Sequence, residues 1–240
     1  MGHTGGNPDD PRLSDGSVKF LFKRPRIEAP LRPLERIHEG YFASRRVRLI
    51  CDHLLLLIPP SPLMLDVGGG DGKIARELVR RRPDIELRGI DVIVRPGAAY
   101  PVDLYDGRAI PFTDRSFDVV LLVDVLHHTE DPLVLLREAA RVAREAILIK
   151  DHLSDRFLAL PTLRFMDRVG NARFGIALPH NYWSRRSWLD AFQLLGLRVA
   201  AWKNDLKLYP PVLDWFFGRS LHFVAQLYPA GPILAKEHPI

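Results

Sequence analysis

The sequence predicts an α/β protein in which a doubly wound, mostly parallel sheet of seven strands is covered by helices on both faces. Short apolar runs alternate with segments of helical spacing over residues 62–150, and this alternation is typical of parallel strands joined by right-handed helical crossovers. A glycine-rich turn follows the first of these runs. The chain has 240 residues, of which 47% are hydrophobic, so it can bury the core of one such domain.

The N-terminal part divides into a polar leader and a helical segment. Residues 1–33 contain five prolines and the basic run 23–26, and we expect a flexible leader with a solvated basic run rather than an anion-binding patch. Residues 34–240 are expected to form a single domain. Apolar residues recur at helical spacing over residues 34–57, so we predict one or two helices that cover one end of the sheet.

The middle of the chain supplies strands and helices in alternation. Short apolar runs predict the strands, and helical spacing predicts the helices. The second of these helices begins at Asp131 and Pro132, an acidic cap followed by a first-turn proline. The predicted strands are residues 63–67, 86–91, 100–104, 117–124 and 146–150, and the predicted helices are residues 74–82 and 131–142.

The last third of the chain is expected to enlarge the same sheet. Residues 183–195 have helical spacing, and residues 197–203 and 221–227 are predicted as two further strands. Residues 151–182 form a long insert after the fifth strand. We expect a helical lid that shapes the substrate site, because inserted segments at an active edge often carry specificity. The alternative is a packing helix with solvated arginines.

Composition and charge exclude several classes of protein. No apolar run reaches the roughly 18 residues that span a bilayer, so we expect no transmembrane segment. The net charge of +5 is modest and spread along the chain, and no nucleic-acid-binding module is apparent. Cys51 is the single cysteine and lies in an apolar helical pattern, which predicts a buried thiol and a reducing, cytoplasmic setting. The sequence carries no signal for the oligomeric state.

The turn after the first strand has the composition of a nucleotide-binding loop without matching a phosphate-binding pattern. Gly68, Gly70 and Gly72 give G-x-G-x-G, whereas the dinucleotide fingerprint needs a glycine where Lys73 stands. The P-loop pattern fails as well, because Ile74 follows Lys73. Glycines at this edge of a parallel sheet leave the backbone open to a ligand.

Acidic residues around the turn favour a cationic ligand over a pyrophosphate. Asp66 and Asp71 flank the glycines, and Asp91 ends the second predicted strand about 20 residues further on. An acidic side chain at that offset can accept hydrogen bonds from both hydroxyls of a ribose. The sequence therefore predicts a site for a positively charged nucleoside that carries no phosphate.

Four motifs together resemble those of class I S-adenosylmethionine-dependent methyltransferases. Residues 65–72 (LDVGGGDG) resemble motif I of these enzymes, and residues 89–92 (GIDV) are similar to their second motif. Residues 105–120 resemble the GDA..LPF…SFDVV segment of the type 11-like subgroup that includes ubiquinone- and menaquinone-type methyltransferases, and residues 125–132 (VLHHTEDP) complete it. The resemblance covers about residues 62–150.

The resemblance implies a Rossmann-like fold, S-adenosylmethionine as cofactor, and a set of binding residues. In this family Asp66 and the glycines would hold the methionine end, Asp91 the ribose and Asp106 the adenine amino group, while Asp124 and the following turn would face the methionine moiety and the methyl group. Gly69 stands where the family often has Ser, Thr or Cys. The implied cofactor-binding residues are Asp66, Val67, Gly68, Gly69, Gly70, Gly72, Asp91, Val92, Asp106, Gly107, Asp124 and Val125.

Methyl transfer is an in-line displacement in which alignment supplies much of the rate, so the fold does not dictate one catalytic residue. A base is needed where the acceptor must lose a proton. We take His127, His128, Asp151 and His152 as candidates, with His128, Asp151 and His152 preferred, because they follow predicted strands at the ligand edge. The alternative is that the histidines pack or cap the next helix.

Three functions remain open from the sequence. A small-molecule methyltransferase is the leading one. The basic charge suggests an RNA or protein methyltransferase, but residues 124–127 (DVLH) lack the Pro-Pro and aromatic pattern of enzymes that methylate base amino groups. The third function is a non-catalytic scaffold that binds the cofactor.

Overall fold

The computed structural model describes residues 43–171, 179–218 and 220–229. The predicted leader 1–33 lies outside the described residues, as does the start of the predicted N-terminal helical segment. Within the described residues, no helix is both long enough and apolar enough to cross a membrane.

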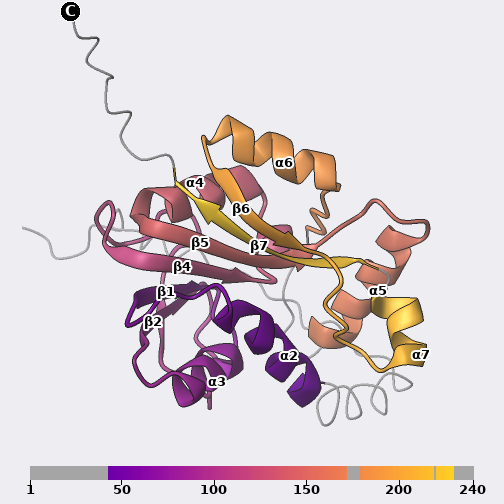
Figure 1. Ribbon diagram of the computed structural model, residues 1–240, viewed down its shortest axis with the longest axis horizontal. Helices are drawn as coiled ribbons and strands as arrows, with labels where there is room; N and C mark the ends of the chain where they lie inside the picture. The colour runs from indigo at the N-terminus through magenta and orange to yellow at the C-terminus, as the bar shows by residue number, and fades with distance from the viewer. Residues whose placement is uncertain (1–42, 172–178, 219, 230–240) are drawn as a thin grey trace, which may run out of the picture.

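The predicted seven-stranded sheet is confirmed. Its strand order is β3-β2-β1-β4-β5-β7-β6, with β7 antiparallel to both neighbours and the other pairs parallel (Figure 1). The strands are β1 (Leu63–Val67), β2 (Glu86–Asp91), β3 (Val102–Leu104), β4 (Phe117–Val123), β5 (Ala143–His152), β6 (Arg198–Lys203) and β7 (His222–Tyr228).

Helices cover both faces of the sheet (Figure 1). On one face, Ile50 and Leu54 pack with Leu78 against the strands, and on the other Leu136 and Trp188 do the same. Cys51 is fully buried, as predicted. The helices are α2 (Ala43–Leu55), α3 (Lys73–Arg81), α4 (Pro132–Val142), α5 (Ala159–Asn171), α6 (Arg185–Leu194) and α7 (Pro211–Leu213), with a 3-10 turn η3 (Leu126–His128) before α4 and a π-turn η4 (Asp214–Gly218) after α7.

The cap predicted for α4 has the expected physical basis, and α6 begins with a similar cap. Asp131 caps α4 by accepting a hydrogen bond from the backbone amide of Leu133, and Pro132 opens the helix. Ser184 caps α6 in the same way by accepting from the amide of Ser187.

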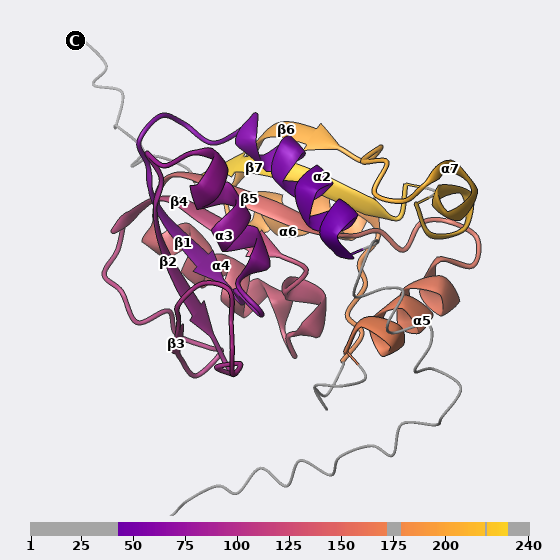
Figure 2. The same cartoon turned by 90° about the horizontal axis from the view of Figure 1, so that it is seen from below.

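The end of β5 differs from the prediction. Asp151 and His152 were expected to follow the strand, but they are its last two residues, opposite Phe223 and His222 of the antiparallel β7. The strand continues because β7 supplies backbone partners there, a pairing of residues about 70 apart in the chain. The insert then forms α5, which lies with α7 at one end of the sheet (Figure 2).

Candidate active site

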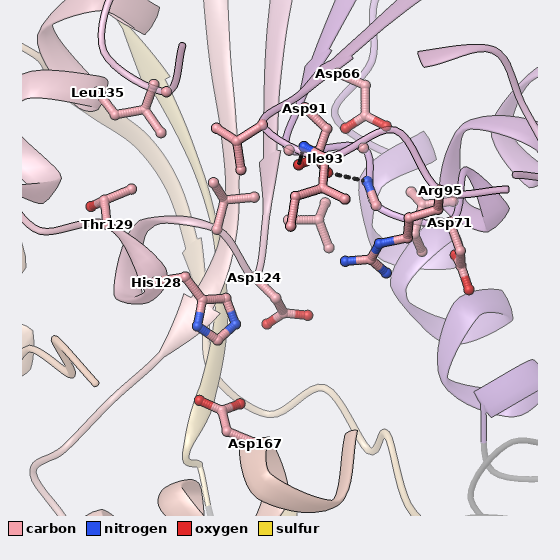
Figure 3. Close-up of a pocket in the computed structure, with 18 of the residues that line it drawn as sticks. Asp66, Asp71, Asp91, Ile93, Arg95, Asp124, His128, Thr129, Leu135 and Asp167 are labelled. Carbon is pink, nitrogen blue, oxygen red and sulfur yellow. Dashed lines mark hydrogen bonds between the residues drawn. The ribbon is translucent and has the colours of Figure 1, made fainter. Parts of the chain in front are cut away.

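A cavity of about 850 Å³ opens at the carboxyl ends of the parallel strands, where open α/β sheets bind ligands. Asp66, Asp91, Val123 and His152, from the ends of four strands, all line it. Its volume lies within the range of small-molecule and cofactor sites. Figure 3 shows its carboxylates converging from opposite walls.

The glycine turn forms one wall of this cavity and has no room for side chains at two positions. Gly68, Gly70 and Gly72 adopt left-handed backbone conformations with φ of 74°, 60° and 69°. A Cβ at Gly68 would lie 2.4 Å from Cγ2 of Val125, and one at Gly72 would lie 2.5 Å from the amide nitrogen of Tyr100. The sequence therefore needs glycine there for both conformation and close packing.

Asp91 ties the glycine turn to the second strand. Its Oδ2 accepts a hydrogen bond from the Gly70 amide at 2.8 Å, drawn in Figure 3, and its Oδ1 accepts from the Ile93 amide at 3.1 Å. The side chain is nearly buried and lines the cavity. This is the place predicted for an acid that binds a ribose, and each carboxylate oxygen retains acceptor capacity.

Asp66 lies beneath the turn, where its charge is poorly solvated. Its Oδ2 is 3.1 Å from the position that a Cβ at Gly69 would take. Burial and the neighbouring carboxylate of Asp91 raise the pKa of Asp66 to about 7. A bound cation would therefore stabilise the ionised form of Asp66 more than solvent does in the free protein.

Val92, Asp106 and Gly107, which were predicted to bind the cofactor, all line the cavity. Oδ1 of Asp106 accepts from the amides of Arg108 and Ala109 at 2.8 and 2.9 Å, and these bonds lower its pKa. Gly107 has φ of 77°, and a Cβ there would lie 2.8 Å from Cγ1 of Val92. The missing side chain thus lets Val92 pack against the loop.

Asp124 also lines the cavity, but its carboxylate is engaged by two cations that the sequence analysis missed. Arg46 of α2 and Lys150 of β5 both bind it. Burial opposes its ionisation, but these charges outweigh burial and hold the pKa of Asp124 well below its usual range. Burial lowers the pKa of Lys150 to about 8. Lys150 is fully buried, and no local pattern signals that a strand-end lysine will pair inward.

The catalytic candidates come together in one histidine–aspartate cluster. Nδ1 of His127 lies 2.6 Å from Oδ1 of Asp151, and Nδ1 of His152 lies 3.3 Å from the same oxygen. His128 and His152 line the cavity. His127, which was considered beside His128 but not preferred, therefore pairs more closely with Asp151 than His152 does.

The histidines of this cluster differ in charge. Burial and the charge of His127 lower the pKa of His128 to about 4, and burial and the charge of Lys150 lower the pKa of His152. Burial acts on His127 as well, but the carboxylate of Asp151 outweighs it and raises the pKa of His127 to about 10. At neutral pH the two cavity-lining imidazoles are neutral and can accept a proton.

The sequence analysis also missed Asp167 of α5. Its Oδ2 lies 3.5 Å from Nε2 of His127 and accepts a hydrogen bond from the hydroxyl of Tyr182. Asp167 lies four residues after the buried Leu163 and next to Met166, so it occupies a position on the inward face of the helix. An acid on an apolar face was the one available signal.

Solved structures share this fold. A chain from the complex between the Haloferax volcanii Trm112 methyltransferase activator and a methyltransferase matches with a TM-score of 0.60 and 20% identity, covering 83% of this chain and 95% of that one. A SAM-dependent methyltransferase from Aquifex aeolicus matches with a TM-score of 0.53 and 16% identity, covering 83% and 98%.

Curated relatives are similar to part of the chain. The 27-O-demethylrifamycin SV methyltransferase of Amycolatopsis mediterranei is 29% identical over 46% of this chain and 48% of its own length. Demethylmenaquinone methyltransferase of Thermotoga maritima is 30% identical over 48% and 56%. The chain thus spans about half the length of these two proteins. Ajmaline N-methyltransferase of Rauvolfia serpentina is 28% identical over 72% and 71%.

A family model for the methyltransferase domain matches residues 41–201, well over half of the chain. The match includes the glycine turn, Asp91, Asp124 and the histidine–aspartate cluster. The chain therefore belongs to the methyltransferase domain family, in agreement with the resemblance of its motifs to those of class I methyltransferases.

Proposed function

We propose that the protein transfers a methyl group from S-adenosylmethionine to a small-molecule acceptor. The observation that carries this proposal is how the cavity is lined. The glycine turn, tied to Asp91 by the Gly70 amide, forms one part of the wall, and the neutral side chains of His128 and His152 line the part that we call the acceptor end. The names of the relatives above refer to 27-O-demethylrifamycin SV, demethylmenaquinone and ajmaline, all small organic molecules. These names support the acceptor class.

The residues present fit the cofactor. The atoms nearest to a Cβ at Gly70 would be those of the Arg95 guanidinium, at 3.5–3.8 Å, so the turn faces a flexible side chain there and no packed backbone. Among the described residues that line the cavity, eight are acidic and four are Lys or Arg. That balance suits a ligand with a sulfonium and an ammonium group and no phosphate. Asp66 and Gly68–Gly70 would hold its amino-acid end, Asp91 its ribose, and Val92, Asp106 and Gly107 its adenine.

The cofactor supplies an activated methyl group when bound, and the chain supplies alignment, charge and exclusion of water. Gly68 and Val125 fix the wall against which the methionine end would lie. Ion pairs with Arg46 and Lys150 hold the Asp124 carboxylate in place where it lines the cavity. Alignment of this kind raises the rate without a covalent contribution from the protein.

The acceptor end of the cavity holds the proposed base. His152 lines the cavity and is oriented by Asp151, whose Oδ1 also accepts the backbone amide of His152 at 2.8 Å. A neutral imidazole in this place can accept the proton of a hydroxyl or amine acceptor. His128 is the second candidate, since it lines the same space.

The insert 151–182 is proposed to shape the substrate site. Met166, Asp167 and Val169 of α5 line the cavity opposite the strand ends. The division into a leader 1–33 and a domain 34–240 stays a prediction.

One observation favours an RNA or protein acceptor as the second candidate. The fold neighbour from Haloferax volcanii comes from a complex with a methyltransferase activator, so a related fold accepts a protein partner. Against it, α5 encloses the acceptor end, which leaves the proposed base within a cavity rather than on an open face.

Calorimetry and a transfer assay test the proposal. S-adenosylhomocysteine should bind, and Asp91→Asn should weaken it by about 1.5–3 kcal/mol through lost hydrogen bonds to a charged group. Asp103→Asn, on the exposed side of the neighbouring β3, is the matched control and should leave affinity unchanged. Binding of NAD or ATP in preference to S-adenosylhomocysteine would refute the cofactor site. Labelled methyl transfer to RNA but not to small hydroxylated or amino compounds would favour the second candidate, and binding without transfer would favour a scaffold.

A further inference from the structure

We propose that His127, His128 and Asp167 form a binding site for one divalent transition-metal ion in the wall of the acceptor end of the cavity. The three residues come from two segments that are far apart in the chain, the 3-10 turn η3 and helix α5. Each offers one ligand atom, and these atoms all lie within 4.8 Å of one another. A small inward movement of the side chains would bring them around a single ion.

The placement of His128 and Asp167 gives the site access to the cavity. Both residues line it, and Figure 3 shows the His128 ring beside the Asp124 carboxylate and above the Asp167 carboxylate. His127 lies behind them and is only 1% exposed. An ion held by these three residues would therefore have protein on one side and the acceptor space on the other.

Asp151 orients His127 as metal-bound histidines are usually oriented. Its Oδ1 accepts from Nδ1 of His127 at 2.6 Å, and both side chains are almost completely buried. A carboxylate on one ring nitrogen fixes the tautomer and presents the other nitrogen to a metal. Here that other nitrogen is Nε2, which faces Asp167.

Buried ring nitrogens without hydrogen-bond partners supply the second line of evidence. Nε2 of His127 and Nδ1 of His128 are both buried and lack a hydrogen-bond partner among the described residues. At 3.5 Å, Oδ2 of Asp167 pairs with Nε2 of His127 by charge without forming a hydrogen bond of good geometry. Buried polar atoms in folded proteins are normally satisfied. A metal ion placed between His127 and Asp167 would satisfy Nε2 of His127, the ring nitrogen that faces Asp167.

The donor set indicates which ion fits. Two imidazoles and one carboxylate suit zinc or iron(II), and three protein ligands leave at least one position open for another ligand. Magnesium and calcium prefer oxygen ligands and fit this set poorly. A second nearby group, His127 with Asp151 and His152, is less suitable, because Nδ1 of His127 is already bonded to Asp151.

The use of such an ion rests on the proposed methyl transfer. A metal in this wall would bind an acceptor oxygen at its open position and lower the pKa of that oxygen. The acceptors favoured by the site would then be hydroxyl or enol groups rather than carbon or tertiary nitrogen. Metal binding itself requires neither acceptor nor cofactor.

Zinc binding to the metal-free full chain tests the site without an activity assay. Calorimetry with Zn²⁺ should show one saturable site, and substitution of Co²⁺ should give visible absorption bands from nitrogen and oxygen ligands. His127→Ala and Asp167→Ala should abolish saturable binding, and Asp151→Asn should weaken it by about 10–100-fold, as loss of an orienting partner does. His53→Ala is the matched control, since His53 lies on helix α2 and bonds to the Leu206 carbonyl, away from the cluster, and should not change the affinity.

Two results would overturn the site. One is the absence of saturable binding to the wild type. The other is equal affinity in His127→Ala, provided that thermal melting shows the variant to be folded. S-adenosylhomocysteine affinity measured in parallel separates the two proposals. A protein that binds the nucleoside but no metal loses only the metal site, and one that binds the metal but not the nucleoside loses only the proposed function.

Discussion

Gly68 packs against Val125 so closely that a Cβ at residue 68 would lie 2.4 Å from Cγ2 of the valine. This contact brings the turn after β1 against the turn after β4. Gly68 also has φ of 74°, so a side chain there meets both a packing conflict and a backbone penalty.

Gly68→Ala should therefore weaken S-adenosylhomocysteine binding strongly and lower the free energy of unfolding by about 2 kcal/mol or more. Gly97→Ala separates the two causes. Gly97 has φ of 72°, and nothing lies within 4 Å of the position that its Cβ would take, so only the backbone penalty of about 1–2 kcal/mol should remain. Calorimetry and urea unfolding measure both effects. If the double variant Gly68→Ala/Val125→Ala recovers no affinity, the packing explanation is wrong.

Asp66 should make cofactor binding depend on pH. Its pKa is about 7 in the folded protein because burial and Asp91 disfavour the charge, and the ammonium group at the ligand's amino-acid end binds the ionised form better. Affinity for S-adenosylhomocysteine should rise roughly tenfold between pH 6 and 8, with proton release on binding. Asp66→Asn should remove this rise. A wild type whose affinity is flat over that range would contradict the assignment.

The same group affects stability with the opposite sign. The folded pKa of Asp66 lies above its unfolded value of about 4, so its contribution is present below pH 4 and is lost as the pH rises through 7. Without ligand, the free energy of unfolding of the wild type should therefore fall from pH 5 to pH 8. That of Asp66→Asn should not fall in this way, so the variant gains stability relative to the wild type as the pH rises. Urea unfolding at the two pH values tests the sign.

The strands and caps were predictable from the sequence because their signals are local. The apolar run before the glycines and the Asp131–Pro132 pair each act within a few residues of themselves. The same holds for Asp91, whose place follows from the offset between a glycine turn and the next strand end.

The rest of the site depends on contacts between distant residues, which no local pattern contains. Arg46 meets Asp124 across 78 residues, and Lys150 meets it across 26. Asp167 reaches His127 only because α5 folds back over the strand ends. The predicted end of β5 was wrong for the same reason, since its partner strand lies about 70 residues further along the chain.

Lys150 should be more important for stability than its single charge suggests. It is fully buried and shares Asp124 with Arg46. Lys150→Met removes one of the two charges that compensate a nearly buried carboxylate, and breaking such a pair costs about 3–5 kcal/mol. Lys203→Met, at an exposed position of β6, should change stability by less than about 0.5 kcal/mol. Equal unfolding midpoints for the two variants would show that Arg46 alone compensates Asp124.

His152 should affect turnover and leave cofactor binding intact. It lines the acceptor end of the cavity and is held by Asp151 through both its backbone amide and its ring. If it accepts the acceptor's proton, His152→Ala should lower kcat by about 10²–10⁴-fold, the usual contribution of a positioned base. S-adenosylhomocysteine affinity should stay within about twofold, because the ribose and methionine contacts lie on the other side of Asp124.

Asp151→Asn should give a smaller loss with a shifted pH profile, since it orients the base without touching the acceptor. His53→Ala, on α2, serves as the control for a lost histidine. Unchanged kcat in His152→Ala would exclude it as the base and leave His128 as the candidate to test next.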